Sequence, residues 1–130
     1  LARESEDITL DAGRVTEGVA AALGDDSKGF YLIAEIDGQR AGQLMITYEW
    51  SDWRNGVFWW FQSVYTMPEF RGRGLARRAL GELCARLLQR APSVCLFVNL
   101  VNEPALAVYR RLGFHELSPW ASAFHVRAKV

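Results

Sequence analysis

The fold is decided by one stretch of sequence, Val64-Tyr65-Thr66-Met67-Pro68-Glu69-Phe70-Arg71-Gly72-Arg73-Gly74-Leu75-Ala76-Arg77. An apolar strand breaks at the proline, and a glycine-rich turn then opens a helix whose apolar positions share one face: Ala76, Leu80, Leu83 and Leu87. A helix N-terminus after such a turn presents unpaired N–H groups and the positive end of the helix dipole. The glycines allow close approach of a bulky anion such as a pyrophosphate. Positive charge is added by Arg71, Arg73, Arg77 and Arg78.

Three known phosphate-binding patterns are candidates for this turn. A P-loop requires Lys-Ser/Thr after its last glycine, where this chain has Leu75-Ala76. A dinucleotide-binding turn requires a third glycine, where Arg77 stands. The pattern Arg/Gln-x-x-Gly-x-Gly/Ala is matched in full from Arg71 to Ala76. For the turn alone, an anion site of this third kind and a turn that only lets helix and strand pack are equal alternatives.

Length and composition narrow the class of protein. The 130 residues suit one domain spanning residues 1–130. A formal net charge of zero argues against a nucleic-acid binder, and no apolar run is long enough to span a membrane. Leu1 is not a natural start, so we expect the chain to be a fragment or to lack its first residues. Cys84 and Cys95 lie in apolar stretches without metal-ligand spacing, which predicts reduced core residues of a cytoplasmic protein and no metal.

The rest of the chain predicts alternating helices and strands. In order, we expect a helix from an Asp11 cap to about Leu23, strands 30–36, 41–50 and 57–66, a helix to about Arg90, a strand 94–100, a helix from Asn102 to Gly113, and strands 114–117 and 121–129. This order predicts an α/β (α+β) fold with a mixed, mostly antiparallel sheet and helices on both faces.

A second motif follows downstream: Asn102-Glu103-Pro104-Ala105-Leu106-Ala107-Val108-Tyr109-Arg110-Arg111-Leu112-Gly113-Phe114. It resembles the signature Asn-x-x-Ala-x-x-x-Tyr followed by Gly-Phe of the GNAT N-acetyltransferases, whose pyrophosphate loop has the pattern of Arg71–Ala76. Loop and helix stand in the family's order and at about its separation, and the resemblance covers roughly Phe30 to Leu117. From the resemblance we expect that the first strand of the GNAT fold is missing from this chain.

The resemblance implies acetyl transfer from acetyl-CoA to a primary amine by direct attack. The strand before the loop would pair with the pantetheine arm, and one of its N–H groups would polarise the thioester carbonyl. Tyr109 would act as general acid toward the departing thiolate, although its alternative role is an amphipathic core residue. The implied donor-binding residues are Val64, Tyr65, Thr66, Arg71, Gly72, Arg73, Gly74, Leu75, Ala76, Arg77, Asn102 and Ala105.

The general base is less evident. The family often uses a glutamate on the strand before the loop, but strand 57–66 contains no acid. Glu49 and Asp52, on the hairpin that leads into it, are the nearest candidates; Glu49 is otherwise a solvated strand residue, and Asp52 a turn hydrogen-bond acceptor. Trp50 lies among the aromatic residues of this hairpin, which predict cross-strand packing and, more specifically, a substrate pocket or a homodimer surface.

Within the superfamily, the nearest pattern is that of the diamine (spermidine/spermine) and thialysine acetyltransferases. The polyamine enzymes carry an acidic pair where this chain has Gln62-Ser63. We therefore expect Gln62 and Trp50 to contact a small primary amine rather than a long polyamine. A catalytically silent acyl-CoA-binding module, serving as a sensor or interaction domain, is the alternative function.

Overall fold

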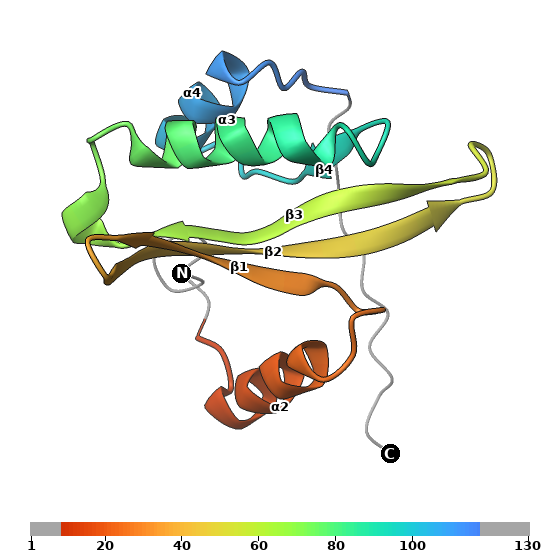
Figure 1. The fold of residues 1–130 in the computed structure, drawn as a ribbon, viewed down its shortest axis with the longest axis horizontal. Coiled ribbons are helices and arrows are strands. Elements are labelled where there is room, and N and C mark those ends of the chain that lie inside the picture. Colours follow the sequence, from red (N-terminus) through yellow and green to blue (C-terminus); the bar gives the residue numbers. More distant parts are fainter. Residues whose placement is uncertain (1–8, 118–130) are drawn as a thin grey trace.

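The computed structural model describes residues 9–117, and the account that follows is confined to them. In chain order the elements are α2 (Ala12–Leu23), β1 (Phe30–Ile36), β2 (Gln39–Ser51), β3 (Gly56–Thr66), the short 3₁₀ helix η1 (Pro68–Phe70), α3 (Leu75–Leu87), β4 (Val94–Leu96) and α4 (Glu103–Arg111). Figure 1 shows α3 and α4 on one face of the sheet and α2 on the other.

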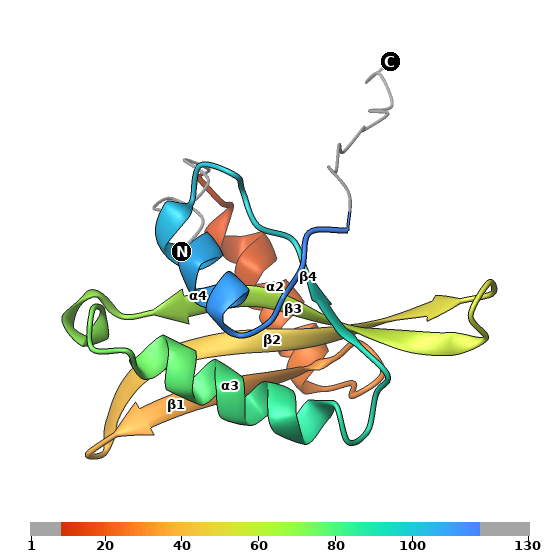
Figure 2. The same cartoon turned by 90° about the horizontal axis from the view of Figure 1, so that it is seen from above.

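The strands form one sheet in the order β1-β2-β3-β4. The β1–β2 and β2–β3 pairs are antiparallel hairpins, and β4 returns parallel to β3 after the α3 crossover. The expectation of a mixed, mostly antiparallel sheet with helices on both faces is therefore confirmed. Seen from above in Figure 2, α3 and α4 lie side by side over the sheet, and the β2–β3 hairpin extends past both.

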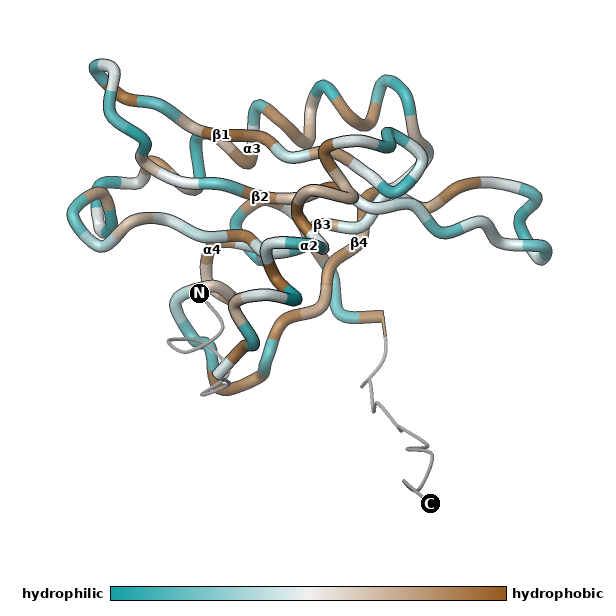
Figure 3. The backbone as a smooth tube through the Cα atoms, turned by 90° about the horizontal axis from the view of Figure 1, so that it is seen from below, coloured by the Kyte–Doolittle hydropathy of each residue, from teal (hydrophilic) through white to brown (hydrophobic). Residues whose placement is uncertain are grey.

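The core lies between the sheet and α3. Leu44, Ile46 and Phe61 from the strands pack against Leu80 and Leu87 of the helix. Hydrophobic and hydrophilic segments alternate along α3 in Figure 3, as expected for a helix that buries one face. Burial of this face fixes the N-terminus of α3 at the end of β3.

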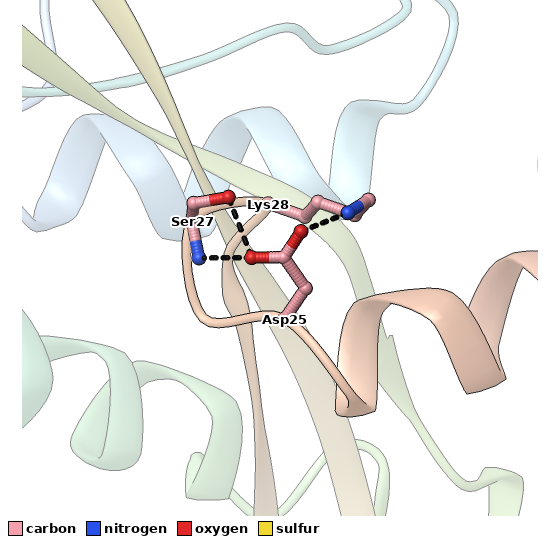
Figure 4. Close-up of polar contacts among 3 residues, drawn as sticks. All are labelled: Asp25, Ser27 and Lys28. Carbon is pink, nitrogen blue, oxygen red and sulfur yellow. Dashed lines mark hydrogen bonds and ion pairs between the residues drawn. The ribbon is translucent and has the colours of Figure 1, made fainter.

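The connection between α2 and β1 is held by a local polar cluster (Figure 4). The Asp25 carboxylate accepts hydrogen bonds from the backbone N–H of Ser27 at 3.0 Å and from its hydroxyl at 2.6 Å, and it pairs with the Lys28 ammonium. These contacts favour the charged carboxylate, with Lys28 the largest contribution, and lower the pKa of Asp25 from 3.8 to about 2.

Two predicted elements are shorter than expected. The strand 94–100 ends at Leu96, where pairing with β3 stops; Phe97 and Leu100 beyond it are 54% and 67% exposed rather than covered on both faces. Helix α3 ends at Leu87 rather than near Arg90, because the N–H of Arg90 bonds to the Leu87 carbonyl in a tight turn ahead of Pro92.

The two strands expected at the end of the chain have different outcomes. Residues 114–117 form no strand, because the N–H of Phe114 bonds to the Tyr109 carbonyl at 3.1 Å and so closes the end of α4 rather than joining the sheet. The strand predicted at 121–129 lies outside the described residues. None of the helices within residues 9–117 combines the length and the apolar character that crossing a membrane requires.

Candidate functional site

A cleft of about 880 Å³ opens between the end of β3, the glycine-rich turn and α4. Of the predicted donor-binding residues, all but Arg73 line it: Val64, Tyr65, Thr66, Arg71, Gly72, Gly74, Leu75, Ala76, Arg77, Asn102 and Ala105. Tyr109 lines the same cleft. The crossover through α3 thus brings two motifs together that are some thirty residues apart in the sequence.

The cleft begins where β3 and β4 separate. The two strands pair only at Trp59↔Val94, Trp60↔Cys95 and Phe61↔Leu96. Strand β3 continues to Thr66, paired on its other edge with Gly42 of β2. The edge of β3 next to the cleft therefore extends past its last pair with β4, a geometry that suits an extended ligand lying along a strand.

Strand β3 has a bulge just before this edge. The register shifts between Gln43 and Met45 of β2, opposite Ser63, which has a positive φ of 51°. A β-carbon on Gly42 would lie 2.6 Å from the Tyr65 carbonyl oxygen, so the two strands approach too closely for any other residue. This bulge was not predicted from the sequence, although a glycine inside a predicted strand is a recognised signal for one.

The glycine-rich turn presents backbone N–H groups to the cleft. Gly72 and Gly74 have φ values of 75° and 70°, and a β-carbon on either would meet no atom within 4 Å. Gly74 is the N-cap of α3 and provides no side-chain cap; the first helical bond runs from the Arg78 N–H to the Gly74 carbonyl at 3.1 Å. The amides of residues 75–77 consequently lack intrahelical acceptors, and free N–H groups at a helix N-terminus are suited to an anion.

The four arginines near the turn have different surroundings. Arg77 lines the cleft. Arg71 also lines it, but its Nε donates to the Thr66 carbonyl at 2.8 Å and its guanidinium lies 5.3 Å from the Tyr65 ring centre, so it ties the turn to β3. The guanidinium of Arg73 lies 6.0 Å from the ring centre of Phe70, and Arg78 lines a second groove.

The two hollows beside α3 differ in charge. Among the described residues, the larger cleft is lined by three arginines, Arg71, Arg77 and Arg111, and by no aspartate or glutamate. The second groove, about 600 Å³ between α3 and strands β1 and β2, has Arg78 with three acids: Glu35, Asp37 and Glu82. An anionic ligand is therefore attracted to the first cleft and repelled by the second.

Helix α4 supplies the other wall of the cleft. Asn102 caps it, accepting from the Ala105 N–H at 3.3 Å. The ring of Tyr109 packs edge-on against Phe114 at 5.7 Å between centres. Burial raises the pKa of Tyr109 above its usual 10.0, and the nearby Cys84 adds to the rise. Tyr109 therefore stays protonated at neutral pH, as a general acid must.

The predicted acceptor-side residues lie outside the cleft lining. Glu49 pairs with Phe58, six residues before Val64, or about 20 Å along the strand. The Asp52 carboxylate accepts from the Trp53 N–H at 2.8 Å, within its own turn. Trp50 is 62% exposed on the hairpin, and the Gln62 amide donates to the Thr47 hydroxyl at 3.2 Å.

Several lining residues were not predicted. They are Phe70, Leu80, Val101, Pro104, Val108 and Arg111. The helical spacing of Pro104, Val108 and Arg111, four and then three residues apart, places them along one side of α4 and is readable from the sequence. No group of three potential metal ligands occurs within residues 9–117.

Comparisons with known proteins agree with this geometry. The model of the acetyltransferase (GNAT) family matches residues 3–114. Mycothiol acetyltransferase from Corynebacterium aurimucosum is 29% identical over 120 residues, which are 87% of this chain but only 40% of that protein. The chain therefore spans less than half the length of this curated relative.

Two solved structures are also similar. A possible acetyltransferase from Clostridium difficile 630 is 34% identical, with a TM-score of 0.80 over 98% of this chain and 85% of that one. A predicted acetyltransferase from Clostridium acetobutylicum, solved with acetyl-CoA, is 23% identical, with a TM-score of 0.69 over 92% and 80% of the two chains. The second shares the fold.

Proposed function

The chain belongs to the acetyltransferase (GNAT) family, and from this membership we propose that it transfers the acetyl group of acetyl-CoA to a primary amine of a small molecule by direct attack. The observation that carries the proposal is a single cleft lined by both the glycine-rich turn and Tyr109. An anion site and a protonated acid within one cleft are what acyl transfer from a thioester of a phosphorylated carrier requires.

The donor site is built mainly from backbone. The amides of residues 75–77, at the N-terminus of α3, hold the pyrophosphate, and Arg77 adds positive charge. The edge of β3 from Val64 to Thr66, beyond its last pair with β4, pairs with the pantetheine arm, and an N–H of this edge polarises the thioester carbonyl. Acetyl-CoA supplies the activated acyl group.

Tyr109 gives a proton to the sulfur as the carbon–sulfur bond breaks. Its position on α4, one turn after Ala105, keeps the phenol in the cleft with the donor-binding residues. The raised pKa keeps the phenol protonated until the carbon–sulfur bond begins to break. Concerted transfer to the departing sulfur avoids a free thiolate in the cleft.

The acceptor amine has to lose a proton before it attacks. Within the described residues no carboxylate lines the cleft, and the strand register separates Glu49 from it by about 20 Å. We therefore assign deprotonation of the amine to solvent, which makes kcat/KM rise with pH up to the pKa of the acceptor itself. Acceptors whose amine pKa values differ by one unit should shift this pH limb by the same amount.

The acceptor is a small amine rather than a long polyamine. The neutral Gln62 amide is engaged with Thr47, so this part of β3 carries no charge that would attract a polycation. Carboxylates at these positions would each contribute roughly 1 kcal/mol or more toward a partly desolvated ammonium chain. A competition assay with spermidine, lysine analogues, an aminoglycoside and simple aralkylamines tests this; spermidine as the best acceptor by kcat/KM would contradict it.

A silent acyl-CoA-binding module is the second candidate, favoured because none of the described residues that line the cleft is a carboxylate. Two measurements separate the candidates. Acetyl-CoA at one hundred times its Kd should stabilise either protein by about 2.7 kcal/mol, seen as a raised Tm. Release of CoA during incubation with the amine panel then identifies the enzyme, binding without release identifies the module, and an unchanged Tm at millimolar acetyl-CoA contradicts both.

A further inference from the structure

Both walls of the cleft carry an arginine that lines it from a helix. Arg77 lies in the first turn of α3, and Arg111 is the last residue of α4. Together with Arg71 they give the cleft three positive charges and, within residues 9–117, no lining carboxylate. Charges of one sign that converge on a cleft from separate elements repel one another, and this arrangement is favourable when an anion lies between them.

The neighbouring arginine on α4 has a different partner. The Arg110 guanidinium pairs with the Glu116 carboxylate at 2.8 Å, and Arg110 does not line the cleft. Attraction to the negative end of the helix dipole accounts for a cation at either position. The helix dipole does not explain why Arg111 lines the cleft. Arg111 lies on the same side of α4 as Pro104 and Val108, which also line it. Arg111 is therefore the member of the pair directed to a ligand.

The pyrophosphate has proposed partners other than Arg111. The amides at the N-terminus of α3 and Arg77 already provide for that group on the opposite wall. Coenzyme A carries one further phosphate, the dianionic monoester on its ribose, and a guanidinium fork matches a phosphate in geometry and charge. On the basis of the proposed function, we propose that Arg111 binds the ribose 3′-phosphate and makes the protein prefer CoA to 3′-dephospho-CoA.

The test measures Kd by calorimetry for CoA and 3′-dephospho-CoA with the parent, Arg111→Ala, Arg111→Lys and the matched control Arg110→Ala. The control removes the same charge from the same turn of α4. We expect Arg111→Ala to weaken CoA binding about tenfold and to leave dephospho-CoA within twofold of the parent. Arg111→Lys should fall between, because it keeps the charge but loses the fork. Arg110→Ala should bind both ligands as the parent does.

Three outcomes overturn this assignment while leaving the proposed function intact: equal weakening of both ligands by Arg111→Ala, weakening of similar size by Arg110→Ala, or no change for CoA. The first would mean that Arg111 acts on a group common to both ligands, and the second that only net charge matters. A parent that binds neither ligand overturns the proposed function as well. In steady-state assays, Arg111→Ala should raise KM for acetyl-CoA with kcat and Tm unchanged, whereas a structural lesion would lower Tm.

Discussion

The substitution Gly74→Glu tests the anion site most directly. Gly74 is the N-cap of α3, with a φ of 70° and open space where a β-carbon would be. A non-glycine residue in this conformation costs about 1–2 kcal/mol of folding free energy. The reduced freedom of the unfolded chain offsets roughly 0.4–1 kcal/mol of that cost, and a carboxylate at a helix N-terminus offsets about 0.3–1 kcal/mol. We therefore expect a folded variant, destabilised by about 1 kcal/mol or less.

Binding should respond much more strongly. A carboxylate about 6 Å from a doubly charged pyrophosphate, at an effective dielectric constant of about 40, adds roughly 3 kcal/mol of repulsion, or about a hundredfold in Kd. The assay is calorimetric titration with CoA beside a thermal melt of each variant. Gly74→Gln separates charge from size, because it has nearly the same shape without the repulsion.

A second control places glutamate at another glycine of positive φ that lies away from the cleft. Gly38, in the β1–β2 turn, has a φ of 74° and the same open surroundings, and it does not line the cleft. Gly38→Glu should therefore resemble Gly74→Glu in strain and should bind CoA like the parent. If Gly74→Glu binds CoA within about threefold of the parent while remaining folded, the turn is not the pyrophosphate site.

Three further predictions follow from individual side chains. Tyr109→Phe should lower kcat by about 10²–10⁴-fold with little change in KM, because the ring still packs on Phe114 and only the proton donor is lost. If kcat is unchanged under conditions where chemistry limits the rate, Tyr109 is a packing residue. Ser63→Val should destabilise the fold by about 1–3 kcal/mol and weaken CoA binding, because a β-branched residue resists the positive φ of the bulge. The control Ser63→Gly should stay within about 1 kcal/mol of the parent. Equal melting curves for Ser63→Val and the parent would refute this. The lowered pKa of Asp25 contributes stability that is complete above its unfolded value of 3.8 and is lost as pH falls toward about 2. Asp25→Asn should therefore flatten the pH dependence of the free energy of urea unfolding between these two pH values. If the variant keeps the same pH dependence as the parent, that dependence comes from other carboxyl groups.

The elements that the sequence predicted well are those with local causes. The glycine turn and α3 follow from a proline, two glycines and an apolar stripe within one stretch of chain, and the cap of α4 follows from Asn102 and Pro104. The C-terminal ends of β4 and α3 were predicted wrongly because each depends on hydrogen bonds that the sequence pattern does not show. Strand β4 ends where β3 stops pairing with it, and α3 ends in a turn formed around Leu87.

The sequence by itself thus determined which residues could build an anion site and a general acid, since helix termini, turns and helix faces are set within a few residues of chain. Only the tertiary structure decided which of them share a cleft. Strand register places Glu49 away from it, a register shift opposite Ser63 interrupts the pairing of β3 with β2, and Arg110 pairs with Glu116 while Arg111 lines the cleft. Register and helix packing join residues that are far apart in the chain, and no local pattern specifies them.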